Sequence, residues 1–110
     1  MNRQFLTDQD VEAAFDWLEE HANAVAKARA ERLWVEEFKH SKKAMLMKEH
    51  PGLSVAAQER EAYADPRYIE HLEAIKIAVF EDERLRFLRE DKHARIDAWR
   101  SASANSRVRV

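Results

Sequence analysis

Apolar residues early in the chain recur at intervals that alternate between four and three positions. The residues that follow this spacing are Val11, Phe15, Leu18, Ala22 and Val25. The spacing places them along one face of an α-helix and is typical of a heptad seam. Beyond position 25 the apolar residues spread over several faces, at Ala28, Leu33, Trp34, Val35, Phe38, Met45 and Leu46. The pattern predicts one long helix over residues 8–49 that packs against more than one neighbour.

A second long helix is expected in the other half of the chain. One of its apolar stripes is Ile69, Leu72 and Val79, and another is Phe80, Phe87 and Ala94. Asp65 followed by Pro66 is typical of an N-cap and a first helical position. We therefore predict a helix over 66–102, followed by a basic, flexible tail over 103–110.

Residues that interrupt helices are rare, because the 110 residues include one Gly and two Pro. Pro51-Gly52 predicts the end of the first long helix. Ser54 predicts the cap of a short helix over 54–64. At the start of the chain, Thr7 with Asp10 predicts a capping box.

These elements predict an all-α fold, with a single helical domain over 1–110. We expect an antiparallel hairpin of two long helices with a short helical connection. A two-helix hairpin of this size buries little apolar surface, and the chain has no Cys to form disulfides. We therefore expect a homo-oligomer, as a coiled coil or helical bundle. No apolar run is long enough for a signal peptide or a membrane span, so a cytoplasmic location and no membrane partner are expected.

The charges are distributed in four alternating blocks. The net charge is −5 over residues 1–26, +4 over 27–48, −6 over 49–83 and +5 over 84–110, which gives −2 for the chain. If Glu49 faces Pro66 across a hairpin, the numbers of paired residues sum to about 115 and acidic blocks face basic ones. One interpretation is that these charges set the register of the two helices.

The other interpretation is that the basic residues bind nucleic acid, because phosphate binding needs several Lys or Arg on one face. The candidate residues are Arg32, Lys39, Lys42, Lys43, Lys48, Arg100, Arg107 and Arg109. Trp34 and Trp99 are aromatic residues close in sequence to these basic residues, and they could stack on unpaired bases. A Trp in a helical seam, however, is more often part of the core. The two interpretations of the charges are compatible.

Catalytic and metal-binding patterns are weak in this sequence. Glu37 with His40, and Glu90 with His93, have the Glu-x-x-His spacing that di-iron bundles use. With so many Glu residues, we favour the interpretation that both pairs lie on solvated helix faces and share this spacing by chance. One Gly and no Cys exclude a Gly-rich phosphate loop, a thiol nucleophile and a thiolate zinc site. We therefore expect no catalytic residues, no metal and no cofactor.

Three segments of the chain resemble the phage recombination-mediator family, the UvsY-like proteins. They are 17–21 (WLEEH), the lysines of 42–48 (KKAMLMK) and 65–68 (DPRY). The resemblance implies a small helical protein that helps load a recombinase onto single-stranded DNA coated with a single-strand-binding protein. Lys42, Lys43 and Lys48 match the basic, DNA-contacting stretch of that family. The turn at Pro51-Gly52 departs from the family, since it carries little positive charge.

Two functions from different classes follow from the sequence. The first is a non-catalytic, oligomeric accessory protein of phage-type recombination that binds single-stranded DNA and assists a recombinase. The second is a structural or adaptor coiled coil that binds only protein, because the charge blocks can be satisfied within the bundle. A metal-binding oligomer that uses the two Glu-x-x-His pairs is a third, weaker hypothesis.

Overall fold

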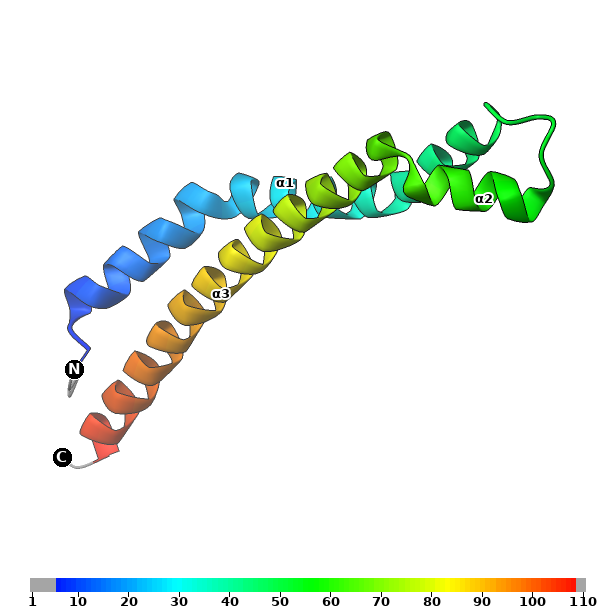
Figure 1. Cartoon of the computed structure of the whole chain (residues 1–110). Helices are drawn as coiled ribbons and strands as arrows, with labels where there is room; N and C mark the ends of the chain where they lie inside the picture. Colours follow the sequence, from blue (N-terminus) through cyan, green and yellow to red (C-terminus); the bar gives the residue numbers. More distant parts are fainter. Residues whose placement is uncertain (1–5, 109–110) are drawn as a thin grey trace. The chain divides into compact units, whose positions relative to one another are not determined.

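A computed structural model describes residues 6–108 of the chain. Its elements are α1 (Asp8–Met47), α2 (Val55–Ala64) and α3 (Pro66–Val108), shown in Figure 1. The prediction of an all-helical chain with two long helices and a short one between them is confirmed for the described residues. None of the three helices, within that range, has an apolar stretch long enough to cross a lipid bilayer.

The helices begin where local hydrogen bonds satisfy their free backbone N–H groups. At α1 the Thr7 N–H donates to the Asp10 carboxylate (2.9 Å) and the Asp10 N–H donates to the Thr7 hydroxyl (3.1 Å), which confirms the capping box. The Ser54 hydroxyl accepts from the Ala57 N–H at 3.2 Å at the start of α2. The Asp65 carboxylate accepts from the Arg67 N–H at 2.8 Å at the start of α3. All three predicted caps are therefore present.

The far end of α3 differs from the prediction, because the helix continues through residues 103–108. These residues were expected to belong to a flexible tail. After Pro66 the sequence contains no Gly or Pro to end the helix, and Ala102 and Ala104 favour it.

The described residues form two compact units, and both long helices contribute to each of them. Unit 1 comprises residues 6–26 and 83–108, and unit 2 comprises residues 27–82. Each unit contains one segment of α1 and one segment of α3, and unit 2 also contains α2.

Unit 1 is an antiparallel pair of helical segments. Its core is formed by Val11, Ala14 and Ile96, with Leu18 and Trp99 packed against them. The Trp99 Nε1–H donates to Asp8 at 2.9 Å, and Lys92 Nζ lies 5.7 Å from the centre of the Trp17 ring. The numbers of these paired residues sum to 107 and 109, about two helical turns short of the predicted register.

The seam of α1 in unit 1 also differs from the predicted stripe. Its row of buried or half-buried positions is Val11, Ala14, Leu18, His21 and Val25, and Asp10 and Trp17 next to this row are also half-buried. Phe15, predicted to lie in the seam, is 49% exposed. Ala14 is 2% exposed, and its small side chain allows the two helices to approach closely. The predicted stripe therefore included Val11, Leu18 and Val25 of this seam, whereas its members Phe15 and Ala22 are exposed. It missed Ala14 and His21, because a small or polar residue does not stand out in a pattern of large apolar residues.

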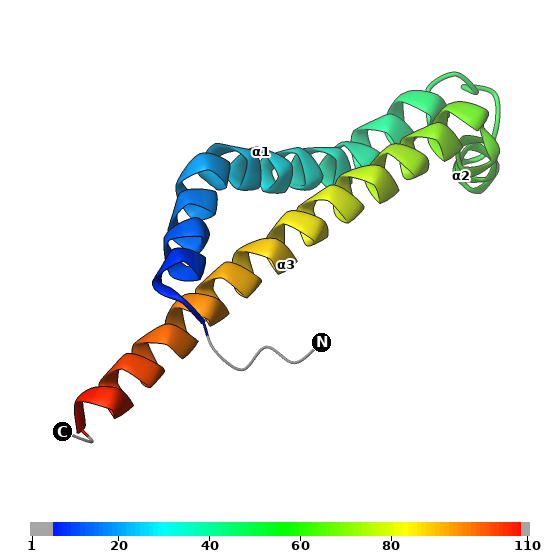
Figure 2. The same ribbon diagram turned by 90° about the vertical axis from the view of Figure 1, so that its left-hand side faces the viewer.

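In unit 2, α2 lies beside the end of α1 and the start of α3, as Figures 1 and 2 show from two directions. The core between these three helical segments consists of Leu46, Ala62 and Tyr68, with Met47 packed against it. The Tyr63 and Tyr68 rings meet edge to face at 5.3 Å between centres. Each helix of unit 2 thus contributes one residue to this core.

Candidate nucleic-acid interface

The predicted basic residues of α1 do not share one exposed face. Arg32, Lys39 and Lys42 are half-buried. They fall on the same heptad row as the buried residues Ala28, Val35 and Leu46. Long basic side chains can cover apolar surface with their methylene groups while their charged ends reach water. These three side chains therefore lie at the edge of the apolar interior of unit 2, with only part of their surface exposed.

Arg32 is engaged in ion pairs within unit 2. Its Nε lies 3.0 Å from the Glu36 carboxylate, and its Nη1 lies 3.2 Å from the carboxylate of Asp82 on α3. Asp82 is a charged residue that is only 7% exposed. A buried carboxylate needs a paired cation, so Arg32 neutralises Asp82 inside the unit.

Lys43 is likewise held by residues of its own unit. Its Nζ lies 3.3 Å from the Glu59 carboxylate and 4.7 Å from the centre of the Tyr63 ring, both on α2. The hydrogen bond with Tyr63 is the main cause that raises the pKa of Lys43, and Glu59 adds to it. Lys43 therefore links α1 to α2, and its charge is already paired with the Glu59 carboxylate.

Asp65, Arg67 and Glu49 form a charged clamp where the three helices meet. The Arg67 guanidinium donates to Asp65 at 2.8 Å and to Glu49 at 3.1 Å. The Arg67 side chain is the main cause that lowers the pKa of Asp65 to about 2, and the positive field of Lys42 contributes. The same Arg67 lowers the pKa of Glu49. A small groove of about 110 Å³ lies between Lys42 and this clamp.

The remaining predicted residues are placed as follows. Lys48 is exposed and Lys39 half-buried, and neither forms an ion pair within residues 6–108. Arg100, in unit 1, lies 4.0 Å from Asp97 one turn earlier on the same helix. The side chain of Arg107 and the whole of Arg109 lie outside the described residues. Lys48, one residue beyond the end of α1, is therefore the one predicted residue between positions 32 and 48 that is both exposed and unpaired within the described residues.

An aromatic platform on α1 lies on a different, outward row of the same helix. Trp34 is 60% exposed, and its ring stacks on Phe38 with 5.0 Å between centres and 8° between planes. Behind it, Phe38 meets the His71 ring edge to face at 5.5 Å. The His71 ring is fixed in turn by a 2.7 Å hydrogen bond between Nε2 and the Val35 carbonyl. Trp34 is thus supported from within the unit while most of its surface meets solvent.

Two exposed lysines share the heptad row of Trp34. On α1 the row consists of Lys27, Glu31, Trp34, Phe38, Ser41 and Met45, and Lys48 continues it one residue beyond the end of the helix. Lys27 and Lys48 form no ion pair within the described residues, and they flank the aromatic platform on either side. Sequence reasoning missed Lys27, although its spacing of seven residues from Trp34 carries the signal.

Trp99, the other predicted stacking residue, has a structural role. It packs against the core of unit 1 and its indole N–H donates to Asp8. Both the apolar and the polar part of the indole are thereby satisfied inside the unit.

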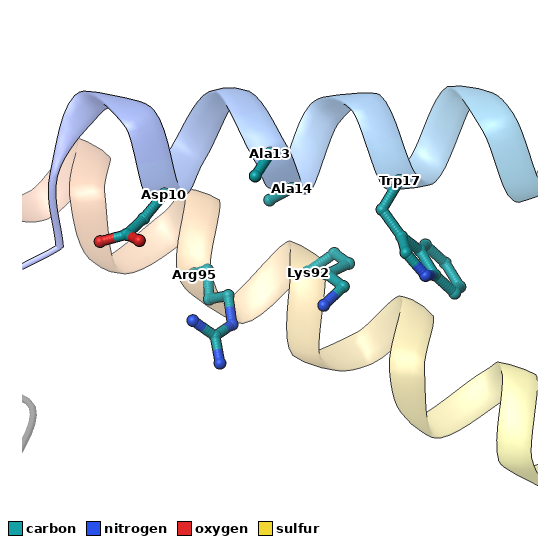
Figure 3. Close-up of a pocket in the computed structure, with 6 residues that line it drawn as sticks. All are labelled: Asp10, Ala13, Ala14, Trp17, Lys92 and Arg95. Carbon is teal, nitrogen blue, oxygen red and sulfur yellow. The ribbon is translucent and has the colours of Figure 1, made fainter.

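A shallow groove of about 330 Å³ crosses unit 1 between α1 and α3. Figure 3 shows Asp10 and Trp17 towards its two ends, with Arg95 and Lys92 between them. The Arg95 Nε lies 2.9 Å from Asp91 and the Lys92 Nζ lies 3.4 Å from the same carboxylate. Both cations are therefore paired with the single carboxylate of Asp91, and Asp10 is engaged in the capping box.

Within residues 6–108, no group of three or more His, Asp or Glu side chains is arranged to hold a metal ion. The two Glu-x-x-His pairs of the third hypothesis, Glu37 with His40 and Glu90 with His93, therefore belong to no such group within these residues. Comparison with models of protein families, with curated proteins and with solved structures finds no match to the chain.

Proposed function

We propose that this chain is a non-catalytic helical accessory protein that binds single-stranded DNA through the outward row of α1. The observation that supports the proposal is the exposed, supported Trp34 ring in the most basic part of that helix. In phage-type recombination, assistance to a recombinase on DNA coated with a single-strand-binding protein is the role that the resemblance suggests.

Stacking and charge have separate parts in this interface. Base stacking on an aromatic ring is worth about 1–3 kcal/mol per base and does not depend on sequence. The flanking Lys27 and Lys48 supply the phosphate contacts, which release counterions and make binding depend on salt. An interface with two such lysines has a modest salt dependence, and its affinity depends mainly on Trp34.

The test is a fluorescence-anisotropy titration with labelled single-stranded DNA at several salt concentrations. We expect Trp34→Ala to weaken binding by about 5-fold or more at every salt concentration, because it removes the stacking contribution. We expect Lys27→Gln with Lys48→Gln to weaken binding and to reduce the slope of log K against log salt by about 1.4.

The matched control replaces two other exposed cations, Arg29→Gln with Arg60→Gln. Arg29 lies on another row of α1, Arg60 lies on α2, and neither forms an ion pair within the described residues. This variant has the same net charge as the lysine pair and should bind DNA much like the parent. Equal losses for both double variants, or no binding by the parent at low salt, would contradict the proposal.

The second candidate function is an adaptor that binds only protein. The observation that favours it is the use of Arg32 and Lys43 in ion pairs within unit 2. An adaptor of this kind gains no thermal stability from single-stranded DNA, whereas a DNA-binding protein is stabilised by its ligand. Melting curves with and without DNA therefore separate the two functions.

A further inference from the structure

The outer face of α3 in unit 2 is unusually apolar for a surface exposed to solvent. Ile77 and Phe80 are each 69% exposed, Ile69 is 50% exposed and Leu72 is 42% exposed. The inner face of the same segment carries the buried residues Tyr68 and Asp82. Four large apolar side chains gathered on an outer helix face are typical of a protein–protein contact.

The order of residues along this face is self-complementary. From one end to the other it consists of Ile69, Leu72, Glu73, Lys76, Ile77 and Phe80. Inverting the order exchanges apolar residues with apolar residues, and exchanges the acid with the base. The centre of this symmetry lies between residues 74 and 75.

We propose that this face pairs with the same face of a second copy of the chain, with the two α3 helices antiparallel. A twofold axis between residues 74 and 75 makes the contact isologous, so that each pairing occurs twice. Ile69 then meets Phe80 of the second copy, and Leu72 meets Ile77. The contact follows about three helical turns of α3.

The charges at the centre select this partner and this orientation. In the antiparallel pair, Glu73 of each copy faces Lys76 of the other. Both side chains are exposed, and neither forms an ion pair within residues 6–108. A parallel pair in the same register would instead set Glu73 against Glu73 and Lys76 against Lys76, which is unfavourable.

The experiment uses charge reversal on the full chain, with the dissociation constant measured by analytical ultracentrifugation. Lys76→Glu sets two acids against each other at both sites of the contact. We expect the dissociation constant to rise by about tenfold or more. Adding Glu73→Lys to Lys76→Glu reverses both charges and restores the pairing, so the double variant should associate like the parent chain.

Phe80→Ser, made in the parent chain, removes apolar contact and should also weaken association. The matched control is Val55→Ser, because Val55 is 67% exposed but lies on α2, away from this face. Circular dichroism verifies that each variant retains its helices. A parent chain that stays monomeric at high concentration would overturn the proposal. So would a Lys76→Glu chain that associates like the parent, or a double variant that fails to recover.

The proposal is independent of DNA binding. Trp34 and Lys27 lie on α1, Lys48 follows the end of that helix, and none of the substitutions on α3 changes them. Failure of the DNA titration therefore leaves the outcome of the ultracentrifugation experiment unaffected, and the reverse also holds.

Discussion

Trp34 and Trp99 are identical side chains with opposite surroundings. The Trp99 indole donates to Asp8 at 2.9 Å and packs against the core of unit 1, so its polar and apolar parts are both satisfied. Trp34 stacks on Phe38 but remains 60% exposed. Keeping a large aromatic ring in water forgoes the stability that its burial would give, and such residues often mark binding surfaces.

Leu46 and Met45 provide a direct comparison of inward and outward positions. Leu46 is 3% exposed in the core of unit 2, whereas its neighbour Met45 is 57% exposed. We expect Leu46→Ala to lower the free energy of unfolding by about 2–5 kcal/mol, since it removes buried methyl groups and leaves a cavity. We expect Met45→Ala to change it by about 0.5 kcal/mol at most.

Urea unfolding followed by circular dichroism measures both values. An equal effect of the two substitutions would mean that the core of unit 2 is not where the structure places it.

At the scale of the elements, the junction of α2 and α3 depends on one carboxylate with two roles. Asp65 follows the last residue of α2, and its side chain accepts from the Arg67 N–H in the first turn of α3. The Arg67 side chain then ties this junction to Glu49 beyond the end of α1. The ionised Asp65 carboxylate thus caps α3 and, through Arg67, helps to hold the junction of the three helices together.

This arrangement predicts how stability depends on acid. The folded chain lowers the pKa of Asp65 from its ordinary value of 3.8 to about 2. The unfolded chain therefore binds this proton first as the pH falls. The stabilising contribution is complete above the ordinary value and is lost as the pH falls through about 2.

The measurement compares melting temperatures of the parent chain and Asp65→Asn across this pH range. Asn retains a capping oxygen but has no carboxyl proton to bind. We expect the parent's advantage over this variant to shrink steadily as the pH falls from the ordinary value towards 2. A difference that stays constant with pH would show that Asp65 and Arg67 are not coupled.

The elements were largely predictable from the sequence because their signals are local. The cap at Ser54, the capping box of Thr7 with Asp10 and the Asp65-Pro66 start each depend on residues within a few positions of one another. The inward row was harder to predict. It includes Ala14, Arg32 and Lys39, which the apolar pattern does not mark.

At the scale of the whole molecule, the register of unit 1 follows apolar contact more closely than charge. Ile96 packs with Val11 and Ala14, whereas the predicted register had placed residues of α3 beyond Ile96 opposite them. Blocks of like charge more than 20 residues long remain complementary after a slide of one or two turns, but buried side chains do not. Charge patterning therefore predicted the antiparallel orientation. It also predicted the alignment within unit 2, where the numbers of the paired residues Arg32 and Asp82 sum to 114 and those of Glu49 and Arg67 to 116, but not the alignment within unit 1.

The candidate site shows the same limitation. Five bases between positions 32 and 48 read as one cluster in the sequence, yet Asp82 and Glu59 engage two of them. Those acids lie 50 and 16 residues away along the chain. Such pairings depend on the tertiary arrangement, which spacing along one helix does not reveal.

The two units have separate cores, and this predicts separate local opening. The core of unit 1 contains Ile96, which is 4% exposed, and shares no residue with the core of unit 2 around Leu46. Regions with distinct cores tend to open as distinct cooperative units. We expect Ile96→Ala to lower the hydrogen-exchange protection of residues 8–26 and 83–106 much more than that of residues 27–82.

Amide hydrogen exchange followed by mass spectrometry resolves these segments. Leu46→Ala is the reciprocal control, and it should affect residues 27–82 most. Uniform loss of protection in both variants would indicate one cooperative unit.

The bend between α1 and α2 offers an entry point for engineering. The lone glycine there, Gly52, has no positive φ angle, and a Cβ placed on it would meet nothing within 4 Å. Neither conformation nor crowding demands a glycine at this point, and residues 51–53 are all exposed. Exposed bends of this kind tolerate inserted sequence well. A fluorescent reporter or an affinity peptide inserted here would leave the Ser54 cap of α2 in place.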